Sequence, residues 1–158
     1  MDWTPSAETT IEELAPGLTL ERLHADKLWV FHLKTVPTRE VVDAWVAGRV
    51  YYRHRIMEPS TDRFLIYDAE QMPRLQYTPY FQEKSRELAN SDPHVTGRLG
   101  LVAPVSGTFR AIMQLFMRRA IKKYQPHLDY GVFNRYAEAL AWVEEDLFRK
   151  YPALGRKN

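Results

Sequence analysis

Short apolar runs alternate along the chain with longer segments whose apolar residues recur at helical spacing. Residues 18–23 alternate apolar and polar side chains, as in a half-buried strand, and residues 28–33 form a continuous apolar run typical of a buried strand. Four residues separate the two runs, so we expect an antiparallel hairpin. Similar runs predict three further strands, at residues 63–67, 98–103 and 127–133.

Four segments with helical periodicity follow the hairpin and the later strands. Each begins at a residue type that favours a helix N-terminus, and Pro or Asp-Pro stops three of them. The expected N-caps are Thr38, Thr78, Ser106 and Asn134, with the first helix running to about residue 57 and ending at Glu58-Pro59. The order ββαβαβαβα predicts an open mixed α/β sheet of about five strands flanked by four helices, with right-handed crossovers between the parallel strands.

The domain organisation that follows is simple. A chain of 158 residues fits one domain, which we place at residues 17–150. Residues 1–16 are expected to be an N-terminal leader in which Thr10 and Glu13 form a capping box for one short helical turn. Residues 151–158 are expected to be a C-terminal tail.

Composition and charge narrow the class of protein. The chain has no cysteine, which excludes disulfides, thiolate metal sites and cysteine nucleophiles and fits a reducing cytoplasm. Its 22 basic and 20 acidic residues are spread along the sequence, so we expect no nucleic-acid partner. The first ten residues lack the apolar region of a signal peptide, and no apolar run approaches a membrane span. We therefore expect a cytoplasmic protein without a transmembrane segment.

No motif in the sequence indicates a cofactor, a metal or a catalytic centre. The five histidines are scattered without HxH or HExxH spacing, and the nucleophile-elbow and phosphate-loop patterns are absent. His32 and His127 fall within predicted strands, where a core or interface histidine is the simpler interpretation. We accordingly predict no bound metal and no cofactor.

A ligand site, if the chain has one, is expected beyond the carboxyl ends of the parallel strands, where loops and helix N-termini meet. Two carboxylates after the third strand are candidates for acid/base work, with a solvated turn as the alternative. The segment before the third helix offers backbone N–H groups and an arginine for an anion, with simple helix capping as the alternative. The candidates are Asp68, Glu70, Ser106, Gly107, Thr108 and Arg110.

The helix predicted over residues 109–121 departs from the pattern of an ordinary surface helix. Apolar side chains lie nearly all around it, whereas a helix that covers one sheet face needs a single apolar stripe. Leu115 and Met117 fall outside that stripe. Its second side is therefore expected to bury against another copy of the chain, the last helix or an apolar ligand. The interface candidates are Ile112, Leu115, Phe116 and Met117.

Four segments together resemble the SpoIIAA-like, STAS-type family and its single-domain bacterial members. These are the hairpin with its following βα units, RFLIYDAEQM with its strand-terminal acid, GLVAPVSGTFRAIMQLF and FNRYAEALAWV. The resemblance covers about residues 18–148 and implies a STAS-like sheet. Asp68 matches the family's acidic position, but no serine or threonine follows before Thr78, so the phosphorylation switch of anti-anti-sigma proteins is not carried over.

Three hypotheses about function follow. The leading one is a non-enzymatic regulatory or protein-interaction module that forms a homodimer through residues 109–121. The second is a carrier or sensor of a small apolar molecule or anion. The third is an enzyme that uses Asp68 and Glu70, which would require a cleft around those carboxylates.

Overall fold

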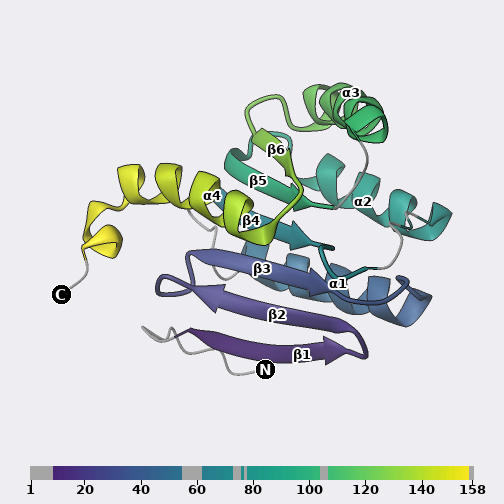
Figure 1. The fold of residues 1–158 in the computed structure, drawn as a ribbon, viewed down its shortest axis with the longest axis horizontal. Helices are drawn as coiled ribbons and strands as arrows, with labels where there is room; N and C mark the ends of the chain where they lie inside the picture. Colours follow the sequence, from purple (N-terminus) through teal and green to yellow (C-terminus); the bar gives the residue numbers. More distant parts are fainter. Residues whose placement is uncertain (1–8, 55–61, 73–75, 77, 104–106, 157–158) are drawn as a thin grey trace.

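The computed structural model describes residues 9–54, 62–72, 76, 78–103 and 107–156, and within the third helix it leaves out the side chains of residues 108–110, 112, 113 and 116. The described part is an α/β fold with one mixed six-stranded sheet and four α-helices (Figure 1). The strands are β1 (Thr10–Ala15), β2 (Leu18–Leu23), β3 (Leu28–Leu33), β4 (Asp62–Asp68), β5 (Thr96–Val102) and β6 (Asp129–Phe133). The helices are α1 (Arg39–Tyr52), α2 (Pro79–Ser91), α3 (Gly107–Tyr124) and α4 (Tyr136–Lys150), followed by the short 3₁₀ helix η2 (Pro152–Gly155). No helix in these described ranges is long and apolar enough to cross a bilayer.

The strands lie in the sheet in the order in which they occur along the chain. β1, β2 and β3 pair antiparallel, which confirms the predicted hairpin, and β3 to β6 pair parallel through helical crossovers. The prediction of about five strands is corrected to six. The additional strand is β1, which occupies residues 10–15, where a short helical turn was expected.

β1 forms because pairing with β2 overrides the local capping signal. A register irregularity lies between Glu13 and Ala15, where Ala15 is buried in the core and Leu14 is partly buried against it. Ile11 lies on the other face and is 70% exposed. The capping-box prediction for Thr10 and Glu13 is therefore wrong.

Helices cover the two faces of the sheet unequally. The first core cluster joins one sheet face to α1, α2 and α3, around buried side chains such as Trp29, Trp45 and Leu65. On the opposite face, α4 packs over β4, β5 and β6 and buries Phe64 and Ile66. Among the described elements, none covers β1 on the α4 face (Figure 1).

The helix starts confirm two of the four predicted caps. The Thr38 side chain accepts a hydrogen bond from the Val41 N–H, and Thr78 accepts one from the Phe81 N–H. Ser106 and the predicted end of the first helix at Glu58-Pro59 lie outside the described residues.

The prediction of Asn134 as the cap of the last helix is wrong. The N-cap of α4 is Arg135, whose side chain makes no capping hydrogen bond. The Glu70 carboxylate accepts a hydrogen bond from the Tyr136 N–H instead, at 2.9 Å. A loop after β4 thus stabilises the start of α4, although 66 residues separate the two partners.

Candidate functional site

The carboxyl ends of β3 and β4 bring a histidine and a carboxylate together on the α4 face of the sheet. The parallel register places His32 directly beside Asp68, and their side chains form a 2.6 Å contact between Nδ1 and a carboxylate oxygen. Asp68 is 7% exposed, so this contact is largely shielded from water. One of the predicted acidic residues is therefore a partner of His32.

The other ring nitrogen of His32 contacts a second carboxylate. Its Nε2 lies 2.7 Å from an oxygen of Glu21, which projects from β2 on the same face. A carboxylate oxygen only accepts hydrogen bonds, so with Asp68 and Glu21 ionised both ring nitrogens donate, which favours the imidazolium form of His32. Burial by itself would lower the pKa of His32, but the hydrogen bonds and charges of Asp68 and Glu21 outweigh it and raise the pKa above its ordinary value of 6.5.

Tyr136 adds a fourth group to the cluster. Its hydroxyl donates to the same Glu21 oxygen at 3.3 Å, and its ring meets the His32 ring edge-on with centroids 5.1 Å apart. Burial and the negative charge of Glu21 raise the pKa of the Tyr136 hydroxyl above its ordinary value. The group Glu21, His32, Asp68 and Tyr136, here called the histidine cluster, links β2, β3, β4 and α4.

The histidine cluster connects three strands of the sheet to the start of α4. Both nitrogens of His32 are occupied, and Asp68 also accepts a hydrogen bond from the Glu70 N–H at 2.9 Å. The two carboxylates of Asp68 and Glu70 bind different partners and do not form a facing pair. Within the described ranges, no three His, Asp or Glu side chains converge as a metal site.

Of the remaining candidates at this edge of the sheet, the structure describes only Gly107 in full. Gly107 begins α3 at an exposed position, and no described atom comes within 4 Å of a Cβ placed there. Ser106 and the side chains of Thr108 and Arg110 lie outside the described part. The structure thus brings Asp68 and Glu70 together with His32 and α4.

His32, Glu21 and Tyr136 were not predicted from the sequence as members of this cluster. The available signal was the strand register, because Asp68 and His32 each lie near the carboxyl end of neighbouring strands. Glu21 lies on β2 two positions from Thr19, the residue that pairs with His32, so the two side chains share a face. Tyr136 could not be predicted from strand register, because its position depends on how the start of α4 packs on the sheet.

The other candidate surface lies on α3, which stands at the periphery of the fold (Figure 1). Among its described side chains only Ile121 is buried, and Leu115 is 52% exposed. Met117, expected on the outer side, packs against the first core cluster. Ile112 and Phe116 have side chains outside the described part.

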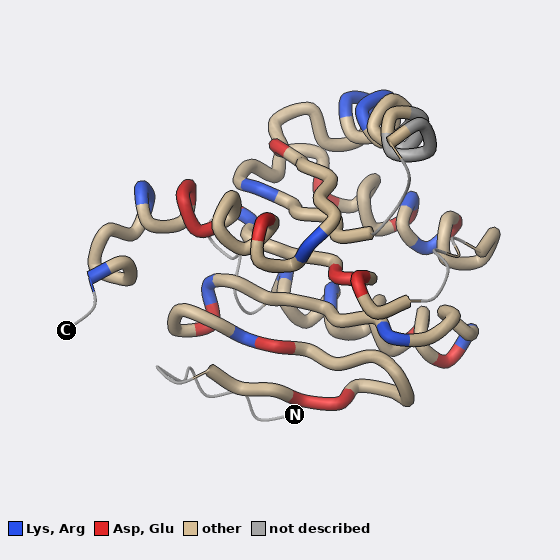
Figure 2. Tube along the Cα trace, viewed as in Figure 1, with Lys and Arg blue, Asp and Glu red and all other residues tan. Residues whose placement is uncertain are grey.

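The charged residues of α3 are all basic. The helix carries five lysines and arginines and no acidic residue. Figure 2 shows basic positions along its described portion, whereas β1 carries only acidic ones. Leu115 therefore lies at the edge of a cationic surface, one turn before Arg118 and Arg119.

Comparison with known proteins identifies no relative of this chain. No model of a known protein family, no curated protein and no solved structure matches it.

Proposed function

We propose that this protein is a non-enzymatic interaction module that forms a homodimer through the exposed side of α3. The observation that carries the proposal is Leu115, a large apolar side chain with about half of its surface exposed, on a helix held to the fold along one side. Exposed apolar positions on an otherwise charged helix are typical of contact surfaces.

The position of Leu115 in α3 suits a two-fold contact. The helix spans Gly107–Tyr124, so its midpoint falls between residues 115 and 116. When two copies of a helix cross antiparallel at their midpoints, each contributes the same residues to the contact, as closed two-fold symmetry requires. Leu115 then packs near its own counterpart, and the small, exposed Ala111 one turn earlier allows close approach.

The charges of α3 are compatible with this arrangement. Four of its five cations lie in the C-terminal half of the helix, at Arg118, Arg119, Lys122 and Lys123. An antiparallel crossing at the midpoint places them opposite partner residues 108–113, of which only Arg110 is charged. A parallel crossing would oppose the two basic clusters directly, which costs energy. The antiparallel dimer is therefore the favoured form.

We also propose that the domain has a STAS-type arrangement. An antiparallel pair of strands followed by strands that alternate with helices supports this, as does the acidic residue at the end of β4. The family's phosphorylation switch is not part of the proposal, because no serine or threonine occupies the position after Asp68.

The test is the mass of the protein in solution across a concentration series, measured by sedimentation velocity. We expect a dimer that dissociates on dilution, and a monomer for Leu115→Glu. The control is Ile11→Glu, which places the same charge at a more exposed apolar position on β1. Circular dichroism checks that both variants fold. A wild-type monomer at about 100 μM, or equal dissociation of both variants, would overturn the proposal.

A further inference from the structure

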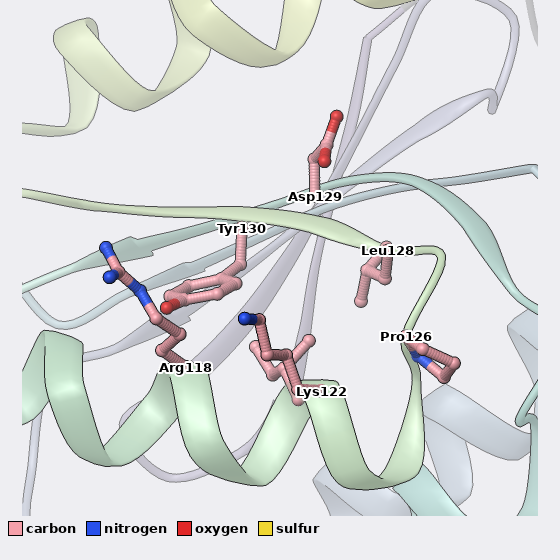
Figure 3. A pocket seen from close by; sticks show the side chains of 7 residues that line it. Arg118, Lys122, Pro126, Leu128, Asp129 and Tyr130 are labelled. Carbon is pink, nitrogen blue, oxygen red and sulfur yellow. The ribbon is translucent and has the colours of Figure 1, made fainter.

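A hollow of about 410 Å³ lies between the C-terminal half of α3 and the start of β6, away from the histidine cluster. Its lining combines an apolar floor with two cations. The seven residues that line it are Arg118, Ile121, Lys122, Pro126, Leu128, Asp129 and Tyr130 (Figure 3). The hollow is open to solvent, so a ligand bound there lies on its floor and keeps part of its surface exposed.

The floor of the hollow is built from the core. Ile121 and Leu128 are buried side chains of the first core cluster, and Tyr130 packs against the same cluster. The Tyr130 hydroxyl donates to the backbone oxygen of Gln114 at 3.2 Å, which ties the ring to α3. The apolar floor is therefore held in place before any ligand arrives.

The cations at the hollow lack a carboxylate partner. Arg118 and Lys122 are four residues apart, so they lie on one side of α3, and both extend toward β6 (Figure 3). Neither forms an ion pair within the described part of the chain. Asp129 is the one acidic residue in the lining, and its side chain points away from α3, on the side of the strand where its register partner is Arg98.

We infer that this hollow binds a small organic anion with a flat apolar body, such as an aromatic carboxylate. The ring or chain of the ligand lies on Ile121, Leu128 and the Tyr130 ring, and Arg118 and Lys122 bind its charged group. Charge-assisted hydrogen bonds to a carboxylate are among the stronger polar contacts in proteins. The inference does not require the proposed dimer, because the hollow lies between α3 and β6 of a single chain.

The chain offers a matched pair of variants for the test. Arg118→Gln with Lys122→Gln removes the two cations that line the hollow. Arg119→Gln with Lys123→Gln removes the same charge from the next positions of the helix, which do not line it. Both pairs are exposed, so the fold is expected to persist in each.

The measurement is titration of the protein with 1-naphthoate, followed by calorimetry and by backbone amide NMR shifts. Its uncharged counterpart, 1-naphthalenemethanol, is titrated in parallel. We expect one-to-one binding of naphthoate, with amide shifts concentrated at residues 118–130 and weaker binding of the alcohol. The Arg118/Lys122 variant is expected to bind about tenfold or more weakly, and the Arg119/Lys123 variant within about twofold of wild type.

Three results would overturn the inference. One is the absence of saturable naphthoate binding. Another is equal weakening by both double variants, which would indicate general attraction to a basic helix. The third is a set of amide shifts located elsewhere on the molecule. Leu115→Gln, which adds no charge beside Arg118, serves as a further check, because loss of the dimer should leave naphthoate binding unchanged.

Discussion

The Nδ1 of His32 donates a 2.6 Å hydrogen bond to the Asp68 carboxylate across two neighbouring parallel strands. Glu21 accepts a hydrogen bond from the other ring nitrogen, so one histidine ring connects three strands of the sheet. This part of the sheet is where the antiparallel hairpin meets the parallel strands. Its stability should therefore depend on the protonation of a single side chain.

Replacing His32 is expected to change how stability varies with pH. The pKa of His32 in the folded chain lies above its unfolded value of 6.5, so its contribution is fully present below that pH and is lost as pH rises through the folded pKa. We expect His32→Gln to lower the free energy of unfolding by about 1–3 kcal/mol at a pH of about 6, and by less at a pH of about 9.

The measurement is urea unfolding of wild type and variant across that pH range. His94→Gln is the control, because His94 is exposed. Its difference from wild type should stay small and nearly constant. A His32→Gln deficit that grows with rising pH would mean that His32 is not held as an imidazolium.

Glu70 should stabilise α4 as a cap supplied from a distant loop. Glu70→Ala removes the acceptor of the Tyr136 N–H and a negative charge at the helix N-terminus, so a loss of about 0.5–2 kcal/mol is expected. Glu70→Gln keeps an oxygen acceptor and should recover part of that loss. Thermal unfolding measures both variants, with the exposed Glu83→Ala on α2 as reference. Equal stabilities of the Glu70→Ala and Glu83→Ala variants would contradict a capping role.

Two buried arginines are expected to respond in opposite ways to the same substitution. Arg49 is 4% exposed, and its Nε and Nη1 have no hydrogen-bond partner among the described residues. The Arg49 guanidinium lies over the face of the Tyr67 ring, 5.9 Å from its centroid. Arg63 is 2% exposed and donates to Asp92 at 2.8 Å, although its Nε also has no hydrogen-bond partner among the described residues. Burial, followed by the nearby charge of Arg49, lowers the pKa of Arg63 to about 10.

Arg49→Met is therefore expected to be neutral or stabilising by about 1–3 kcal/mol, because a buried guanidinium with two unpartnered nitrogens is replaced by apolar volume. Arg63→Met leaves the Asp92 carboxylate without its closest cation and should destabilise by a similar amount. Chemical denaturation of both variants decides the point. A strong loss of stability in Arg49→Met would show that this guanidinium is satisfied.

Most of the architecture could be predicted from local patterns. The hairpin and the strands after it showed alternating or continuous apolar runs, and Thr38 and Thr78 marked helix starts correctly. β1 was missed because Thr10 and Glu13 match a local helix signal, while its strand conformation depends on pairing with β2. The start of α4 was assigned to the wrong cap for the same reason, since Glu70 comes from a distant loop.

The candidate site residues were also predicted only in part. Asp68 and Glu70 could be chosen because they follow a strand, but their partners His32, Glu21 and Tyr136 depend on register and on the docking of α4. On α3, helical spacing alone placed Leu115 outward as observed. It also placed Met117 outward, although the helix is rotated so that Met117 contacts the core.

The central claim is that two copies of α3 meet near Leu115, and a cysteine crosslink tests it most directly. The chain contains no cysteine, so Leu115→Cys introduces a single thiol. Under mild oxidation, we predict rapid formation of a disulfide-linked dimer, because the two-fold axis brings residue 115 of each copy together. Ile11→Cys, a more exposed position, should crosslink far more slowly. Equal crosslinking rates for the two variants, or none at position 115, would contradict the α3 dimer.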